Sequence, residues 1–213
     1  FRAGVLINRR VTFLRRILQG TLRDLLYVAT VTVTLVLVGA VTVHLPAGSG
    51  IHAVTDVLQR WAESGLDQTS RLTLAIGTGG SADFGPAQAC AELVKRLVLV
   101  EAAVADLDLK PAPDVELIKP WKWSEDLDPV LHPMPEAAAW RATIDRLRGR
   151  RVSANLAFQP GTHVYLLTPV DTESDRGGAL VAWNETAPLD EAVVNIFLGE
   201  DDVTVIDMWG NQS

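Results

Sequence analysis

The sequence contains a single cysteine, Cys90, among its 213 residues. One thiol cannot form a disulfide within the chain or supply a cysteine-rich metal site, and its position in an apolar helical pattern predicts a buried structural residue. His52, His132 and His163 show no metal-ligand spacing with one another or with acidic residues. These absences exclude a disulfide scaffold, and they give no reason to expect a metal ion or another cofactor.

Charged residues are absent from residues 25–55. The preceding residues 1–24 contain six arginines and one aspartate, whereas the whole chain has a net charge of −7. The remainder of the chain is therefore strongly acidic, which argues against a nucleic-acid-binding surface. Because 48% of the residues are hydrophobic, the chain has enough apolar side chains for a sizeable core.

The uncharged segment has two interpretations. A helix over residues 25–45 would just span about 30 Å of hydrocarbon, with the arginines marking the cytoplasmic side. However, threonine alternates with valine or leucine over residues 30–35, which is the period of a β-strand. This second interpretation predicts strands near residues 28–38 and 40–45, separated at Gly39. We take the strands as the first hypothesis and a transmembrane helix as the alternative.

Strand and helix patterns alternate up to about residue 150. In chain order we expect an amphipathic helix over residues 5–19, a helix from Val54 to Gly65, a strand at Leu72–Ile76, a helix from Pro86 to Val98, a strand at Val104–Leu109, a Pro- and Trp-rich loop from Pro111 to Pro135, and a helix from Ala137 to Leu147. This alternation is typical of a parallel sheet covered by helices.

The pattern changes after Arg151. Short β-rich runs occur at Ser153–Phe158, His163–Thr168, Ala179–Trp183, Val193–Leu198 and Val203–Met208. Five such runs without a helix between them predict a small antiparallel β-sandwich. The sequence therefore predicts an α/β fold, a partial or degenerate β/α barrel, over residues 1–150 and a β-sandwich-like domain over residues 151–213.

The order of these features resembles part of a known family. The segments Val41–Pro46, Leu72–Gly77 and Val104–Leu109, with the helices between them and the helix from Pro135, resemble the closing strands and helices of a (β/α)8 retaining glycoside hydrolase of the two-glutamate clan. The segments Ala179–Asn184, Phe197–Gly199 and Ile206–Gly210 resemble the β-sandwich that often follows such a barrel. The resemblance covers about residues 40–213 and implies a carbohydrate-active protein.

The resemblance also implies where catalytic carboxylates should lie. Retaining enzymes use two carboxylates about 5 Å apart. The family has its nucleophilic glutamate at the end of the strand Leu72–Gly77, where this chain has Ala75 and Ile76. The partner glutamate would lie on an earlier strand, upstream of Phe1. We therefore expect glycan binding without catalysis by this chain alone, and we assign no catalytic residue.

Three side chains are the candidate sugar-binding residues. Trp121 and Trp123 fall in the long loop, which in a barrel lies on the face where ligands bind, and flat aromatic rings can stack on sugar rings. Both rings could instead cover the core beneath the loop. His44, at a strand end, could bond a ligand hydroxyl, although a histidine in an apolar strand is more often satisfied within the core.

Two further motifs give weaker signals. Asn184 and Glu185 resemble the Asn-Glu pair that carries the acid/base in this clan, but no carboxylate partner is predicted nearby, so we favour a strand-end turn for Glu185. The glycine-rich residues 77–80 lack both the Walker lysine and the Gly-x-Gly-x-x-Gly spacing, so we expect no nucleotide cofactor.

Two functional hypotheses follow. The first is a glycan-binding, glycoside-hydrolase-like protein, and the alternative is a single-pass membrane-anchored structural subunit of a larger complex. Both favour an extracytoplasmic or membrane-associated location. A half barrel has an open sheet edge, which favours a second protein chain that completes the fold. The expected partners are thus a glycan or another protein chain, with membrane contact through residues 25–45 under the alternative and with no nucleic acid.

Overall fold

The computed structural model describes residues 32–36, 40–64, 70–77, 85–118, 121–124, 130–156, 158, 160–171, 177–185, 196 and 203–212. The expected helix over residues 5–19 and most of the glycine-rich loop lie outside these residues. The elements in chain order are β1 (Thr32–Val36), β2 (Ala40–Leu45), the short 3-10 helix η1 (Ala47–Ser49), α2 (Ala53–Glu63), β3 (Arg71–Gly77), α3 (Pro86–Asp106), β4 (Asp114–Ile118), β5 (Trp121–Ser124), β6 (Val130–Pro133), α4 (Pro135–Leu147), β7 (Arg150–Leu156), β8 (Thr162–Pro169) and β9 (Ala179–Asn184).

Residues 32–36 and 40–45 of the uncharged segment form strands. β1 and β2 pair antiparallel with Thr32 opposite His44 and Val36 opposite Ala40. The strand interpretation of this segment is therefore confirmed, and the alternative helix over residues 25–45 is wrong. The physical reason is the two-residue period, which gives β2 one buried and one partly exposed face. Among the described residues, no helix combines the length and apolar character needed to cross a bilayer.

The first sheet has the order β1-β2-β3-β4, in which β2, β3 and β4 run parallel. The buried side chains of β2 and β3 form one hydrophobic cluster with side chains of α2 and α3, so both helices cover the same face. Members of this cluster are Val41, Val43, Leu45, Val54, Val57, Leu58, Leu72, Leu74, Val100 and Ala103. Because strand residues alternate between faces, Thr42 and His44 lie on the face without these helices.

Two expected elements differ from the structure. α3 continues to Asp106, so the strand expected at Val104–Leu109 is wrong. Val104 and Leu107 pack against the first cluster, at helical spacing from Val100. A short run with only three apolar residues fits the period of a helix as well as that of a strand. The strand that joins the sheet is β4, which pairs with β3. The loop expected from Pro111 to Pro135 is also wrong, because it contains β4 and the hairpin of β5 and β6.

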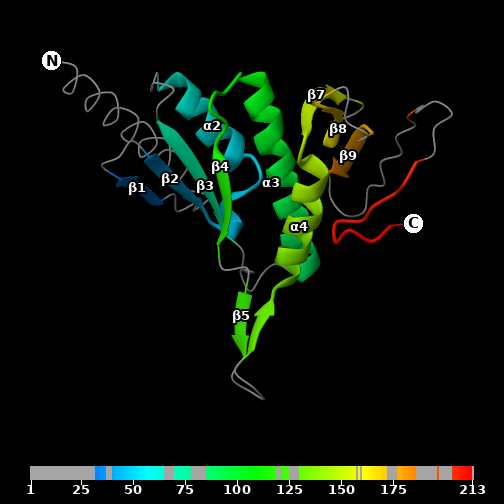
Figure 1. Cartoon of the computed structure of the whole chain (residues 1–213), viewed down its shortest axis with the longest axis horizontal. Helices are drawn as coiled ribbons and strands as arrows, with labels where there is room; N and C mark the ends of the chain where they lie inside the picture. Colours follow the sequence, from blue (N-terminus) through cyan, green and yellow to red (C-terminus); the bar gives the residue numbers. More distant parts are fainter. Residues whose placement is uncertain are drawn as a thin grey trace.

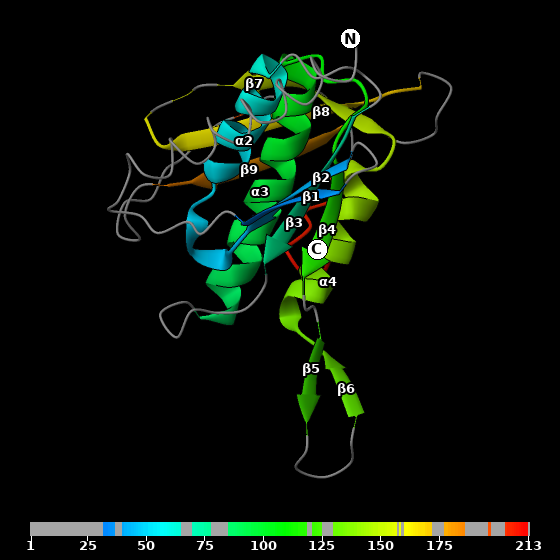
Figure 2. The ribbon, with the colours of Figure 1, turned by 90° about the vertical axis from the view of Figure 1, so that its left-hand side faces the viewer.

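The β5–β6 hairpin extends away from the rest of the structure, beyond the end of β4 (Figures 1 and 2). Its two strands pair antiparallel, with Trp121 opposite Pro133 and Trp123 opposite Leu131. Residues paired across two strands share a face, so these four residues occupy one face of the hairpin backbone. Lys122 alternates with the tryptophans and belongs to the other face.

The second sheet is antiparallel with the order β7-β8-β9, as expected for three of the five runs after residue 151. Of the other two, Val193–Leu198 lies outside the described residues except for Ile196, and Val203–Met208 forms only one isolated bridge. No barrel is closed by the strands that the structure describes. The chain is thus a mixed α/β structure with an open, largely parallel sheet and a separate antiparallel sheet.

Helix α3 lies between the two sheets (Figure 1). A second hydrophobic cluster joins residues of β3, α3, α4, β7 and β8, and it includes Ile76, Leu97, Leu147, Val152 and Leu167. This cluster therefore contains residues from both sides of the boundary predicted near residue 150. Gly149, with φ +73°, lies between α4 and β7, at the position where the sequence predicts the end of the helix.

A tight C-terminal turn packs against α4. The Asp207 carboxylate accepts hydrogen bonds from the backbone N–H groups of Trp209 and Asn211, both at 2.9 Å, and Ile206 forms a bridge with Gln212. Gly210 has φ +91°, and a Cβ added there would lie 3.2 Å from the Ala142 Cβ. Both the backbone conformation and the close approach to α4 therefore require glycine.

Replacing Gly210 with alanine is expected to destabilise the protein by about 1–2 kcal/mol, because an L-residue in this conformation is strained. Gly48→Ala is the matched control, since Gly48 has no positive φ and a Cβ there meets nothing within 4 Å. Chemical denaturation followed by tryptophan fluorescence measures both. Equal stability of the two variants would contradict the close docking of the turn.

Candidate functional site

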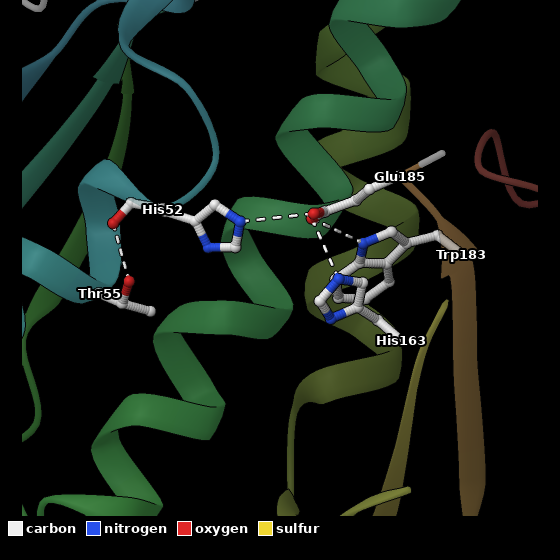
Figure 3. A network of polar contacts seen from close by, with 5 residues as sticks. All are labelled: His52, Thr55, His163, Trp183 and Glu185. Carbon is white, nitrogen blue, oxygen red and sulfur yellow. Dashed lines mark hydrogen bonds and ion pairs between the residues drawn. The ribbon is translucent and has the colours of Figure 1, made fainter. Parts of the chain in front are cut away.

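Three side chains, from three different elements of the structure, converge around the carboxylate of Glu185 (Figure 3). Glu185 Oε2 lies 3.5 Å from His52 Nε2, and Glu185 Oε1 lies 3.3 Å from His163 Nε2. The indole N–H of Trp183 donates to Oε1 at 3.5 Å. We call His52, His163, Trp183 and Glu185 the carboxylate cluster.

The connection between β2 and α2 positions His52. The Pro46 carbonyl accepts hydrogen bonds from the backbone N–H of Ser49 at 3.0 Å and from Arg96 Nη1 at 3.2 Å. The His52 carbonyl in turn accepts the Thr55 hydroxyl at 2.8 Å at the start of α2. His52 therefore sits on an anchored backbone while 60% of its side chain is exposed.

Arg96 is the largest fully buried side chain among those described. Burial lowers the pKa of Arg96, and the Glu92 carboxylate, 3.9 Å from Nη2, acts in the opposite direction. A guanidinium remains charged under such shifts because its ordinary pKa lies far above neutral pH. Its hydrogen bond to the Pro46 carbonyl connects α3 to the segment that leads to His52.

The antiparallel sheet positions the other members of the cluster. His163 on β8 is opposite Trp183 on β9, and their rings stack with centroids 5.1 Å apart. Trp183 also stacks on Tyr165, again at 5.1 Å, and Tyr165 is buried in the second hydrophobic cluster. The Glu185 N–H donates to the Gly161 carbonyl at 2.7 Å. The aromatic rings and this bond fix the carboxylate just past the end of β9.

The environment of Glu185 lowers its pKa. Burial acts to raise it, but the charges of His163 and His52, together with hydrogen bonds from Trp183 and His163, outweigh that effect. The carboxylate is therefore ionised at neutral pH. An ionised, partly exposed carboxylate beside imidazoles and an indole can accept hydroxyl hydrogen bonds, and an exposed imidazole can donate or accept one.

The candidate residues predicted from the sequence lie elsewhere. His44 is on β2, on the sheet face opposite α2, and the structure does not bring it to the carboxylate cluster. Trp121 and Trp123 lie on β5 of the extending hairpin. Ala75 and Ile76 are both buried in β3, with 2% and 0% exposure.

Cys90 is buried, which confirms the predicted burial of this thiol. Burial raises the pKa of the thiol, a hydrogen bond with Trp209 lowers it, and the nearby charge of Glu136 raises it further. Such a thiol is a poor nucleophile. In the part of the chain that the structure covers, no three His, Cys, Asp or Glu residues are arranged to hold a metal ion.

Sequence reasoning missed the cluster, although it favoured a turn at Glu185 and noted the histidines. One signal was available, because alternation places His163 on the face of its strand that also holds Tyr165. The contribution of His52 comes from an element far away in the sequence, and no local spacing predicts that contact.

Comparisons with protein-family models, curated proteins and solved structures find no match to this chain.

Proposed function

We propose that the protein binds carbohydrate without hydrolysing it, and that the carboxylate cluster is part of the binding site. The observation that carries the proposal is the ionised carboxylate of Glu185, held between two imidazoles and next to a half-buried indole. Sugar rings present hydroxyl groups for such acceptors and C–H faces for aromatic rings. The cluster combines both kinds of group.

The architecture supports a ligand site in this region. His52 belongs to the connection that follows β2, and connections after parallel strands are where open α/β sheets and β/α barrels bind ligands. Two successive β-α-β units with helices on one sheet face fit a partial β/α barrel. A partial barrel followed by a β-sandwich is our proposal for the finer architecture, and its open edges favour a second protein chain as partner.

We expect no hydrolysis because the cluster lacks the required pair of carboxylates. A retaining mechanism requires two carboxyl groups about 5 Å apart. The carboxylate cluster has one, Glu185, and the strand position of the family nucleophile carries Ala75 and Ile76. With one carboxylate the cluster can bind a glycoside but has no second carboxylate for a retaining mechanism. Trp121, Trp123 and His44 remain proposed as additional sugar contacts.

Replacing Glu185 with glutamine tests the proposed site. Removing a charged acceptor costs about 1.5–3 kcal/mol, so affinity should fall about 10-fold or more. The measurement is retention on cellulose, chitin and xylan, followed by calorimetric titration with soluble oligosaccharides of whichever polymer retains the protein.

Glu63→Gln is the control because Glu63 ends the helix that His52 begins and lies outside the cluster. It should bind as tightly as the unmodified protein. Equal affinities for Glu185→Gln and Glu63→Gln would remove Glu185 from the site. Failure of every polysaccharide to retain the unmodified protein would contradict the proposed function itself.

A further inference from the structure

The carboxylate cluster also connects two parts of the fold. His52 precedes α2, which packs on the first sheet, whereas Glu185 follows β9 of the antiparallel sheet. The pair at 3.5 Å therefore joins the start of a helix that packs on the first sheet to the end of a strand of the second sheet. His163, on β8, holds the same carboxylate from within the second sheet (Figure 3).

We propose that the His52–Glu185 pair is a pH-dependent clasp between the start of α2 and the end of β9. The contact is an ion pair only when the imidazole is protonated, and imidazoles change charge between about pH 5 and pH 8. A carboxylate interacts more strongly with a protonated imidazole than with a neutral one. This inference does not depend on glycan binding.

Other titratable and charged groups surround the pair. His163 lies beside Glu185, and Asp56 is in the first turn of α2 after His52. Tyr165 on β8 is affected by the charges of Glu185 and of Asp106 at the end of α3, while Arg96 on α3, which bonds the Pro46 carbonyl, lies 3.9 Å from Glu92. Of these, His163 acts on Glu185 in the same direction as His52, whereas Asp106 and Glu185 both act on Tyr165. The cluster therefore has one carboxylate for two imidazoles.

The direction of the pH effect follows from these charges. The folded state lowers the pKa of Glu185, so its contribution to stability is present above the carboxyl's ordinary range and is lost as the pH falls through the lowered value. Protonation of an imidazole increases as the pH falls, and only the protonated ring forms an ion pair with the carboxylate. The clasp should thus be strongest in mildly acidic solution, and weaker both at alkaline pH and in strong acid.

A double-mutant cycle tests the clasp. The four proteins are the unmodified chain, His52→Gln, Glu185→Gln and the double variant, and the measurement is the midpoint of thermal unfolding. Because the His52 side chain is 60% exposed, we expect a modest coupling of about 1–4 °C at about pH 5.5. The coupling should be near zero at about pH 8 and should shrink in 1 M salt.

Each other result overturns the proposal. Coupling of equal size at both pH values would show a contact that does not respond to protonation. No coupling at about pH 5.5 would show that the pair does not join the two elements in solution. Both substitutions lie at the surface and outside the hydrophobic clusters, so the folded state is retained for the comparison. Glu63→Gln, at the end of the helix that follows His52, should show no pH-dependent difference from the unmodified chain.

Discussion

Replacing Leu97 with alanine should lower the free energy of unfolding by about 2–5 kcal/mol, the range for truncating a buried leucine. Leu97 is 2% exposed and belongs to the second hydrophobic cluster, which contains Ile76 of the parallel sheet and Leu167 of the antiparallel sheet. Because one helix supports both sheets, the substitution should weaken both at once. Urea denaturation followed by circular dichroism and by tryptophan fluorescence should give a single, shifted transition.

The control for this prediction is Val170→Ala. Val170 follows β8 and is 62% exposed, so its truncation should change the free energy of unfolding by less than about 0.5 kcal/mol. Two separate transitions, of which Leu97→Ala moves only one, would contradict joint unfolding. They would instead support independent domains on either side of the boundary predicted near residue 150.

The sequence predicted the elements whose period was unambiguous. β2 and β3 have a clear run of buried positions, and α4 begins at a proline and ends before a glycine, so their positions followed from local chemistry. The end of α3 did not, because Val104, Leu107 and Leu109 suit a strand as well as a helix. Packing against the first hydrophobic cluster favours the helix over the strand. The local sequence does not show that this packing surface lies next to the segment.

The same limit explains the candidate site. Trp183 and Glu185 were visible as a strand-end motif, and the spacing of His163 and Tyr165 predicts a shared strand face. The meeting of His52 with Glu185 depends on how α2 and the antiparallel sheet lie relative to α3, which no spacing within either segment contains. The order of charged residues along the sequence likewise does not predict that two imidazoles lie next to the same carboxylate.

The uncharged segment shows how composition can mislead. Its length and its basic flank favoured a transmembrane helix, whereas its alternation of threonine with valine and leucine favoured strands. The register of β1 on β2 agrees with the alternation, with Val33 opposite Val43 and Thr34 opposite Thr42. In this segment, which is rich in β-branched residues, the two-residue period predicts the structure better than the length of the uncharged run does.

Replacing both Trp121 and Trp123 with alanine should remove most retention on whichever polysaccharide the protein binds. The reason is the hairpin register, which places both tryptophans on one face of β5, two residues and hence about 6.8 Å apart along the strand. Loss of two aromatic platforms, each contributing about 1–3 kcal/mol to binding, would lower affinity about 30-fold or more. The midpoint of thermal unfolding should change little, because the hairpin extends from the body of the protein (Figure 2).

Lys122→Ala combined with Ser124→Ala is the matched control for the tryptophan pair. These residues alternate with the tryptophans on the same strand, so the control alters the hairpin equally but leaves the tryptophan face intact. It should bind as the unmodified protein does. If the tryptophan variant loses stability in proportion to retention, both rings serve the core and the sugar-binding role is wrong. If it loses neither, the hairpin takes no part in binding, and Glu185 with its two histidines is left as the proposed contact.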